Sequence, residues 1–486
     1  MSPSETRTQA RYEAAADEMP PLYRNRVKVY PKAVMGRFRL AKWTVLTLCL
    51  SAYYLAPWLR WDRGPGQPDQ ALLIDMSARR AYFFWIEIWP QEVYYLTGLL
   101  ILGAVGLFLA TSLFGRVWCG YTCPQTVWTD LFMWVERLIE GDRNARIKLD
   151  RQPWSVDKAW RKTLKHGLWV LIALATGGAW AMYFNDAPTL VRDLLRFQAT
   201  SSQVFFIGLF TFTTYLLAGW AREQVCTFMC PWPRFQAAML DKHSLVVTYE
   251  SWRGEPRGKH RKAEDAARLG DCVDCGQCHQ VCPTGIDIRD GLQLECIGCA
   301  LCIDACNGVM KKVGLPPNLI SYDTTANIAA RAAGAKPVYH FVRPRTIVYA
   351  ALLAVVALAM LLGLGLRATV EINVLRDRNP LYVTLSDGSI RNGYTIKILN
   401  KAREERVFAL ALNGLDGASM QVVGQENAAG APKLSVRPDQ VGTFRVFLRA
   451  PRDATAEESH PITFALTEQG SGETARHGST FVRPGR

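Results

Sequence analysis

Cysteine is absent from the C-terminal part of this sequence. None of the 13 cysteines lies beyond Cys306, and twelve of them fall in four short motifs. A secreted domain that depends on disulfides would carry cysteines throughout the region that they connect. Tightly grouped cysteines are instead typical of bound metal in a reducing compartment. The remaining cysteine, Cys49, has no partner close to it in the sequence, and we expect it only to pack.

Histidine is also scarce. The chain has seven, and none lies in the interior of a long apolar run; His166 stands only at the edge of one. Haem b inside a membrane needs axial histidines within the spans. The distribution therefore argues against a haem b protein.

Acidic residues are outnumbered by basic ones, 43 against 57, which gives a formal net charge of +14. Such a charge would suit a nucleic-acid partner. However, the Lys and Arg residues cluster beside long apolar runs, as they do on the cytoplasmic flanks of membrane proteins. We therefore expect membrane lipid, and no nucleic acid, as a partner.

Five apolar runs approach the roughly 20 residues that cross a bilayer as a helix. They lie at residues 40–60, 93–114, 164–184, 202–220 and 346–366, and the fourth is the shortest. The mean hydropathy is nevertheless zero, because charged stretches separate the runs. The sequence predicts an α-helical membrane domain with five spans.

The distribution of basic residues predicts the orientation of these spans. Residues 1–39 carry eight Lys or Arg and residues 115–163 carry nine, whereas 62–92 carry three and 185–201 carry two. The more basic loops stay in the cytoplasm. We therefore expect a multi-pass protein of the bacterial inner membrane, with a cytoplasmic N-terminus, a retained first span and a periplasmic C-terminal domain.

The C-terminal region alternates apolar and polar residues. Tyr394, Ile396 and Ile398 alternate in "YTIKILN", and "TFRVFLRA" and "ITFALT" repeat the pattern. Period-two segments separated by turn signals are typical of a β-sandwich. We expect an immunoglobulin-like sandwich without the Cys…Trp…Cys core of antibody domains.

Eight cysteines follow the spacing of two-cluster ferredoxins, C-x2-C-x2-C-x3-C, twice. The pattern predicts that one [4Fe-4S] cluster is held by Cys272, Cys275, Cys278 and Cys306. The other is expected on Cys296, Cys299, Cys302 and Cys282. One departure is Asn307, which stands where a second proline would be usual.

The segment "CGQCH", residues 275–279, matches the attachment motif of haem c. Both of its cysteines are already required by the ferredoxin pattern, and the segment is expected in the cytoplasm. We therefore interpret His279 as an ordinary spacer residue.

Four further cysteines form two C-x3-C-P motifs, Cys119 with Cys123 and Cys226 with Cys230. We call them the four edge cysteines, because each pair directly follows an inward span. The matched contexts indicate a duplicated hairpin whose cysteines meet on the cytoplasmic face. Proline is favoured at the first position of a helix, so "PQTVWTDLFMWVERLIE" is predicted to begin one.

Thiolates are soft ligands that suit Cu(I), zinc or an iron–sulfur centre. The four edge cysteines are therefore candidates for a metal site, a further cluster or a redox dithiol. They could instead only pack or stiffen a turn. Glu136, Asp142 and Arg143 could orient this site, although a helix face and a solvated loop explain them equally well.

Together these features resemble the CcoG/FixG (RdxA) family, accessory proteins of cbb3-type cytochrome c oxidase. The resemblance covers nearly the whole chain, including "IEGDRNARIKLD" (139–150), "GLPPNLISYDTTAN" (314–327) and "LRDRNPLYVTLSDGSIRNGYTIKILN" (375–400). The membrane part alone is similar to polyferredoxins of the quinol-dehydrogenase type. The segment at 375–400 is what points to the oxidase accessory family.

The resemblance implies a cupric reductase, a metal-ion oxidoreductase that converts Cu(II) to Cu(I) for the oxidase's copper centre. The two clusters would deliver electrons, and Cys119, Cys123, Cys226 and Cys230 would bind or reduce copper. Implied partners are oxidase assembly factors or a copper transporter or chaperone, together with an unknown electron donor. A homo-oligomer also remains open.

Two other functions compete with this reading. One is a quinol-linked electron relay without copper chemistry, and the other is an assembly scaffold with structural or sensory clusters.

The expected domains follow from these features. They are a basic N-terminal segment (1–39), a four-span membrane domain (40–250), a two-cluster ferredoxin-like domain (251–345), a fifth span (346–366) and the immunoglobulin-like domain (367–486).

Overall fold

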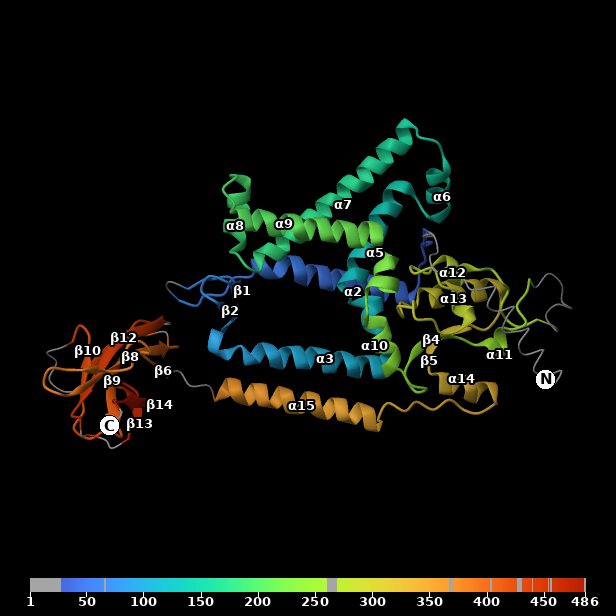
Figure 1. The fold of residues 1–486 in the computed structure, drawn as a ribbon. Helices are drawn as coiled ribbons and strands as arrows, with labels where there is room; N and C mark the ends of the chain where they lie inside the picture. Colours follow the sequence, from blue (N-terminus) through green and yellow to red (C-terminus); the bar gives the residue numbers. More distant parts are fainter. Residues whose placement is uncertain are drawn as a thin grey trace, which may run out of the picture. The chain divides into compact units, whose positions relative to one another are not determined.

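The computed structural model describes residues 28–484, except 65–66, 260–268, 367–369, 403, 426–430, 439, 453 and 455–456. It divides into two compact units, Met1–Leu358 and Ala359–Arg486. The first unit holds long helices and the cysteine motifs, and the second is built of β-strands apart from the helical residues 359–365 (Figure 1). Residues 1–27 of the expected basic segment lie outside the described residues.

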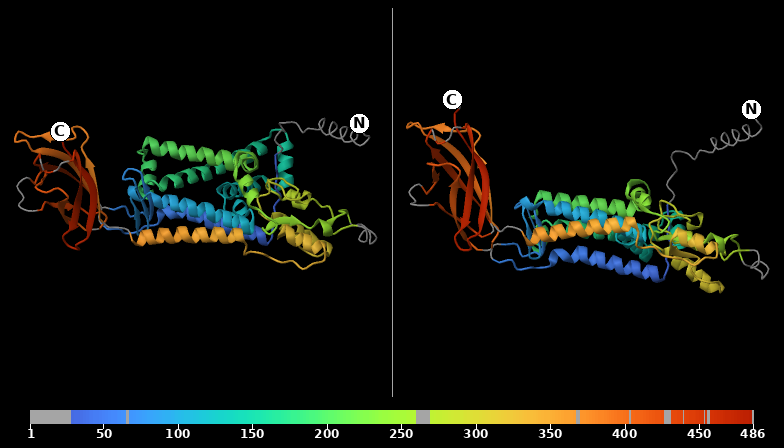
Figure 2. Two further views of the ribbon diagram at one scale, coloured as in Figure 1. Left: turned by 60° about the horizontal axis from the view of Figure 1, so that its bottom comes forward. Right: turned by 90° about the horizontal axis from the view of Figure 1, so that it is seen from below.

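Each of the five apolar runs forms a helix. They are α2 (Arg37–Leu55), α3 (Tyr94–Phe114), α7 (Val156–Met182), α9 (Ser201–Thr214) with its π-helical continuation η3 (Tyr215–Ala221), and α15 (Pro344–Gly365). Helix α7 lies beside α9, and α3 lies beside α15 (Figure 2).

Three of these helices are long and apolar enough to cross a membrane: Pro90–Phe114, Ser201–Ala221 and Pro344–Gly365. Helix α2 falls short because it opens with charged residues, among which Arg39 and Lys42 are buried. Helix α7 is charged along its first turns, from Asp157 to Lys165. The structure supports a membrane-spanning protein, and spans at α2 and α7 remain a prediction.

A small three-stranded antiparallel sheet joins the helices at one end, with strands β1 (Leu72–Asp75), β2 (Arg80–Phe83) and β3 (Ile86–Ile88). Three short helices flank it: η1 (Ala56–Trp58), η2 (Pro90–Glu92) and α8 (Ala187–Leu195). Buried Gln70 accepts from the backbone N–H of Ala187, 2.9 Å away, which fixes the sheet against α8.

At the other end, the two C-x3-C-P motifs and the segments that follow them form five helices. They are α4 (Val117–Tyr121), α5 (Pro124–Glu140), α6 (Arg143–Arg151), η4 (Val225–Met229) and α10 (Trp232–Met239). Helix α5 begins at Pro124, as predicted, with Cys123 as its N-cap residue. Its Phe132 stacks on Trp169 of α7, at 5.3 Å between ring centroids. Helix α5 therefore packs into the helical unit.

The ferredoxin-like region follows as β4 (Val246–Tyr249), α11 (Ser251–Gly254), α12 (Gln277–Gln280), η6 (Ile288–Asp290), α13 (Leu301–Val313), β5 (Ile320–Asp323) and α14 (Thr325–Ala332). Strands β4 and β5 pair antiparallel and flank the cysteine loops. Buried Ile288, Ile303, Met310 and Ile320 form its core together with cysteines.

The start of α2 fastens this region to the helices. The Asp304 carboxylate of α13 accepts from the backbone N–H groups of Phe38 and Arg39, at 3.3 and 2.8 Å. The Arg39 guanidinium donates hydrogen bonds to both carboxylate oxygens of Asp130 in α5. A Cβ atom at Gly36 would lie 2.2 Å from the Asp304 Cγ, so only glycine permits this approach.

The second unit is a β-sandwich. One sheet has the order β10-β12-β8-β6, with β7 paired to β8, and the other has the order β11-β9-β13-β14. The strands are β6 (Val370–Arg376), β7 (Val383–Thr384), β8 (Ile390–Asn400), β9 (Arg406–Asn413), β10 (Ser419–Val422), β11 (Lys433–Val436), β12 (Gln440–Ala450), β13 (Ser459–Glu468) and β14 (Thr474–Val482).

The predicted alternation is confirmed in the core of this sandwich. Tyr394, Ile396 and Ile398 of β8 are fully buried, and they pack with Phe408 and Phe464 from the facing sheet. Burial of one face of each sheet supplies the stabilising apolar contact area. The buried Tyr394 hydroxyl donates to the carbonyl of Thr480, 2.8 Å away, so this polar group is paired.

Candidate functional site

The first group of ferredoxin cysteines surrounds one cavity. Cys272, Cys275, Cys278 and Cys306 line it, and its volume is about 30 Å³. Cys306 comes from α13, Cys278 lies in α12, and Cys272 and Cys275 come from the loop that leads into α12. These are the four residues expected for one cluster.

The second group surrounds a neighbouring cavity of about 20 Å³. Its lining includes Cys282, Cys296, Cys299 and Cys302, with Cys278 of the first group at its edge. Each set of three closely spaced cysteines therefore receives its fourth member from the other motif, as in the exchange that the spacing predicts.

The backbone explains why both loops wrap in the same way. Asp274 and Gly298 occupy equivalent positions in the two motifs and both have a positive φ, 52° and 69°. The next equivalent pair, Gly276 and Ala300, also has positive φ values of 62° and 59°. Left-handed residues reverse the chain tightly and create concave loops that can point backbone N–H groups at an anion.

Asn307 also has a structural role. Helix α13 continues to Val313, so the chain does not turn after Cys306 as it does at Pro283. The Asn307 Oδ1 accepts from the backbone N–H of Asn318, 2.7 Å away, and the Asn307 Nδ2 donates to the Asn318 Oδ1 at 3.2 Å. The asparagine therefore braces the loop that follows the helix.

The residues around these cavities fit [4Fe-4S] clusters. Each cavity offers four thiols, which are the ligands that such clusters use. Burial raises the pKa of Cys278 to about 11 and that of Cys306 to about 12, so iron must displace the thiol protons. Among the described residues, no group of three or more His, Cys, Asp or Glu side chains is placed to hold a single metal ion.

The structure places the four edge cysteines near one another, although no three of them are arranged to hold one metal ion. Cys119 lies in α4, Cys123 caps α5, and Cys226 and Cys230 lie in and after η4. Charges on the other three all act on the Cys226 thiol. The two hairpins also share a backbone hydrogen bond that spans five residues. The N–H of Cys123 donates to the carbonyl of Trp118 (2.9 Å), and the N–H of Cys230 donates to the carbonyl of Val225 (2.8 Å).

Burial sets the protonation of two edge thiols. It raises the pKa of Cys119 to about 11 and that of Cys226 to about 12, and the Arg116 guanidinium counteracts only part of the rise. The Cys119 thiol donates to the Gln236 Oε1, 3.1 Å away. Gln236 is fully buried and also receives the Arg116 Nε–H at 3.3 Å.

The edge cysteines adjoin the second ferredoxin group. Cys119 packs with Ile297 and Cys299 in one buried cluster that Cys226 also contacts. A Cβ atom at Gly120 would lie 2.9 Å from the Ile297 carbonyl oxygen and 3.1 Å from the Cys299 Cα. The Tyr121 hydroxyl donates to the Cys299 carbonyl at 3.3 Å. Helix α4 therefore lies directly on the loop that carries Cys299.

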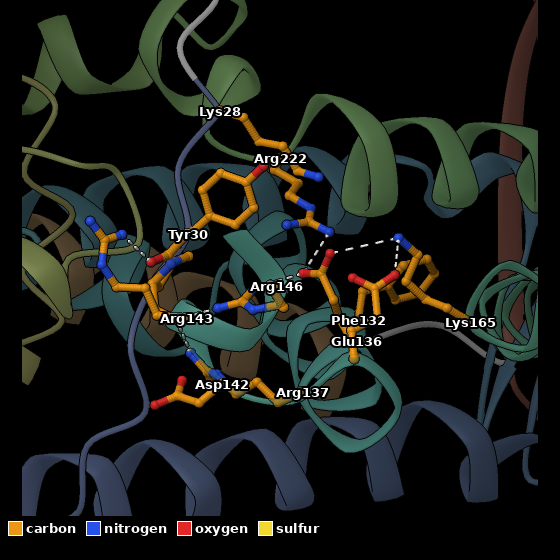
Figure 3. A network of polar contacts seen from close by, with 12 residues as sticks. Lys28, Tyr30, Phe132, Glu136, Arg137, Asp142, Arg143, Arg146, Lys165 and Arg222 are labelled. Carbon is orange, nitrogen blue, oxygen red and sulfur yellow. Dashed lines mark hydrogen bonds and ion pairs between the residues drawn. The ribbon is translucent and has the colours of Figure 1, made fainter. Parts of the chain in front are cut away.

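A buried ionic network supports the second hairpin (Figure 3). The Glu136 carboxylate of α5 pairs with Arg146 at 2.9 Å and with Arg222 at 3.0 Å, and Lys165 lies 3.7 Å away. Arg222 follows η3 and has a positive φ of 49°, just before the segment with Cys226 and Cys230. The ion pair with Arg222 therefore links Glu136 to the second hairpin.

Two other candidates for orienting the site bind a different segment. The Asp142 carboxylate accepts from the backbone N–H of Ala33 at 2.9 Å, and Arg143 donates to the Tyr30 carbonyl at 3.1 Å. The stretch that begins at Lys28 continues to the ferredoxin-like region, where the N–H of Lys32 donates to the Gln280 carbonyl. Asp142 and Arg143 thus anchor the N-terminal segment.

Sequence reasoning did not identify Gly120, Gln236 or Arg222. Gly120 matters through contact with residues near position 298, and Gln236 lies far along the chain from Cys119. No local pattern marks such contacts. The one available signal was the matched context of the two C-x3-C-P motifs.

Comparisons with known proteins agree with this architecture. Three family models match: a 4Fe-4S dicluster domain at residues 221–325, a 4Fe-4S binding domain at 96–141, and the IG-like fold at the C-terminus of FixG at 360–484. The second match includes Cys119 and Cys123.

Curated relatives match along most of the chain. Nitrogen fixation protein FixG of Rhizobium meliloti is 50% identical, covering 96% of this chain and 94% of that protein. Protein RdxA of Cereibacter sphaeroides is 49% identical, covering 92% and 93%. Ferredoxin-type protein NapH of Haemophilus influenzae is 24% identical, covering 55% and 85%.

Among solved structures, a FixG-related protein from Vibrio parahaemolyticus matches 24% of this chain and 98% of its own, at 25% identity and a TM-score of 0.21. FixG and RdxA each share about half of their residues with this chain over more than nine-tenths of its length. The chain therefore belongs to the FixG/RdxA family of ferredoxin-type iron–sulfur electron-transfer proteins.

Proposed function

We propose that this protein is a membrane-bound cupric reductase, which passes single electrons to Cu(II) at the four edge cysteines. The Cu(I) produced is destined for the copper centre of a cbb3-type cytochrome c oxidase. One observation carries the proposal: Gly120 beside Cys119 abuts the backbone of Cys299 with no side chain between them. Cysteines of the two kinds therefore share one buried cluster.

The eight ferredoxin cysteines hold two [4Fe-4S] clusters in this proposal, which supply one-electron transfer when bound. Cys272, Cys275, Cys278 and Cys306 hold one, and the other four hold the second.

The edge thiols are the proposed copper ligands. Cu(II) takes up one electron and becomes Cu(I), which soft thiolate ligands favour over Cu(II). Binding releases protons from Cys119 and Cys226, since burial keeps these thiols neutral without metal. Gln236 holds the Cys119 thiol, and Arg116 offsets part of the negative charge that the thiolates acquire.

The proposed setting is the bacterial inner membrane, crossed by multiple spans. The N-terminus, the edge cysteines and residues 251–345 face the cytoplasm, and residues 367–486 face the periplasm. Oxidase assembly factors, or a copper transporter or chaperone, are the proposed partners. The positive-inside distribution of Lys and Arg supports this orientation.

The test compares the wild type with the quadruple variant Cys119→Ala, Cys123→Ala, Cys226→Ala and Cys230→Ala, prepared without oxygen. Iron, copper and the electron paramagnetic resonance signals are measured, and Cu(I) formation is followed after reduction with dithionite. We expect eight irons in both proteins, with copper binding and Cu(II) reduction lost only in the variant. Unchanged Cu(II) reduction in the variant would remove the edge cysteines from the proposal.

Two alternatives predict different results, the first in this experiment and the second in a separate one. A pure electron relay would bind no copper in either protein, yet it would still pass electrons to an acceptor. An assembly scaffold would support oxidase assembly after the ferredoxin cysteines are replaced.

A further inference from the structure

A partly open cavity of about 100 Å³ lies beside the second ferredoxin group. The Cys296 side of that group forms part of its wall. Most of the remaining lining is apolar, contributed by Ala237 and Leu240 of α10, Val246 and Val247 of β4, and Leu292 and Leu294. Of this lining, the copper proposal involves only Arg116 and Cys296, and the ionic network involves none of it.

The cavity lies where helices of the membrane unit end. The N–H of Leu245, directly before β4, donates to the Leu113 carbonyl at the end of α3, 3.1 Å away. At the other side, Arg345 in the first turn of α15 donates to the carbonyl of Met239 in α10. Both α3 and α15 are long and apolar enough to cross a membrane. An apolar molecule dissolved in the bilayer therefore has a short route to the cavity.

Three polar side chains join the apolar lining: Arg116, Gln293 and Tyr322. The Gln293 Nε2 donates to the Asp287 carbonyl at 2.6 Å, which leaves its Oε1 to accept from a hydroxyl. The Tyr322 hydroxyl donates to the Gly298 carbonyl and can accept in turn. Arg116 is a cationic donor that suits a carbonyl oxygen.

We propose that this cavity binds the ring of a membrane quinol, which is the electron donor of the protein. A single ring with two oxygens matches a small apolar cavity with a few polar groups. Its apolar tail would leave past Leu292 and Leu294, which are 54% and 52% exposed. A lipid acyl chain would have no use for the three polar side chains.

The electron balance is simple. The quinol would lose two electrons and two protons and become a quinone, and the two [4Fe-4S] clusters that the eight ferredoxin cysteines would hold can each supply a one-electron acceptor. The protons leave to water. This inference deepens the proposed function, since it names the donor, but it does not require copper to be the acceptor.

Adjacent alanines on α10 offer a matched test. Ala237 lines the cavity and is half-buried, whereas Ala238 is exposed and lies outside the lining. Ala237→Phe would fill the cavity, and Ala238→Phe adds the same group elsewhere. The full-length protein in detergent is titrated anaerobically with duroquinone, a tetramethylquinone, and binding is followed by quenching of tryptophan fluorescence. Its reduction by duroquinol is then followed by absorbance.

We expect Ala237→Phe to weaken duroquinone binding at least tenfold and to slow reduction by duroquinol similarly, while Ala238→Phe stays within twofold of the wild type. Iron content and dithionite-driven Cu(II) reduction should stay unchanged in Ala237→Phe, which separates this inference from the proposed function. Equal effects of the two substitutions, or no duroquinone binding by the wild type, would overturn it. Displacement of duroquinone by added phospholipid would identify the cavity as a lipid site, and that result would also overturn the quinol proposal.

Discussion

At the residue scale, the most consequential position is one without a side chain. Gly120 allows α4 to touch the loop of Cys299, and a methyl group there would meet two carbonyl oxygens at 2.9 and 3.0 Å. Contacts that short force the backbone apart, because these carbonyls belong to a rigid loop. The glycine therefore controls the separation between the ferredoxin cysteines and the edge cysteines.

Gly120→Ala tests this control. We expect iron content to remain near that of the wild type, while Cu(II) reduction by the dithionite-reduced protein slows several-fold because the two sites move apart. Single-turnover absorbance measures the rate. Gly178→Ala is the matched control, since a Cβ there meets nothing within 4 Å. Equal rates for wild type and Gly120→Ala would show that the close approach is irrelevant to electron transfer.

Lys42 is a second residue whose role depends on position. It is 1% exposed, its Nζ lies 3.8 Å from Asp130, and its charge stabilises the thiolate form of Cys299. A reduced cluster carries one more negative charge than an oxidised one, so a nearby cation raises the reduction potential.

Lys42→Met should therefore make the potential of the second cluster more negative, by something on the order of 50 mV for a unit charge in an effective dielectric of about 20. A redox titration followed by electron paramagnetic resonance measures the shift. Lys42→Arg, which keeps the charge, should restore most of the wild-type value. A potential that does not move in Lys42→Met would show that the charge is screened from the cluster.

At the element scale, α5 connects the two cysteine hairpins. Its N-terminus carries Cys123, and its Glu136 is ion-paired with Arg222 before the second hairpin. Burial alone would raise the pKa of Glu136, but Arg222, Arg146 and Lys165 lower it to about 2. Removing one partner from a buried ionic network leaves the other charges without compensation.

Glu136→Gln should destabilise the protein by about 3–5 kcal/mol. Asp157→Asn is the control, because Asp157 is 65% exposed and its pair with Arg161 should contribute at most about 0.5 kcal/mol. Thermal unfolding in detergent compares the two. Similar losses in both variants would mean that the network adds nothing beyond a surface pair.

The same group predicts a dependence on pH. The pKa of Glu136 is lowered on folding, so its stabilisation is complete above the ordinary value of 4.5 and disappears as the pH falls towards about 2. In that window, wild-type stability should fall more steeply with acidification than that of Glu136→Gln. Parallel curves would contradict the assignment.

The sequence could predict the elements whose signals are local. The ferredoxin loops depend on spacings of a few residues, and the start of α5 depends on Pro124. Contacts between distant segments have no such signal, as Gly36 with Asp304 and Gly120 with Cys299 illustrate. The π-helical geometry of η3 and η4 could not be predicted from the sequence either, because an apolar run is compatible with an α-helix or a π-helix.

At the scale of the whole molecule, the proposed site at the edge cysteines depends on the membrane topology. Hydropathy predicted five spans, of which the fourth, at 202–220, was the weakest prediction. That run forms a helix long and apolar enough to cross a membrane, whereas α2 and α7, which contain buried charged residues, do not. Both hairpins must end on the same side of the bilayer for their cysteines to meet. Cys226 packs against the buried cluster that contains Cys119, which agrees with this requirement.

Reporter fusions test the topology directly. Fusions to alkaline phosphatase after Gln152 and Gly334 should be inactive, whereas fusions after Arg79 and Phe197 should be active, since only the latter are expected outside the cytoplasm. Fluorescent-protein fusions, which need the cytoplasm, should give the reverse pattern. Opposite locations for the ends of the two hairpins would exclude a shared cysteine site in the membrane-inserted protein.

One rapid-mixing measurement bears most directly on the claim that electrons leave through the four edge cysteines. Dithionite-reduced protein, freed of excess reductant, is mixed anaerobically with Cu(II), and cluster absorbance and Cu(I) are recorded together. The wild type should form one Cu(I) for each electron lost, while the quadruple edge-cysteine variant, with the same iron content, should stay reduced. Equal rates of Cu(I) formation in the two proteins would contradict the account.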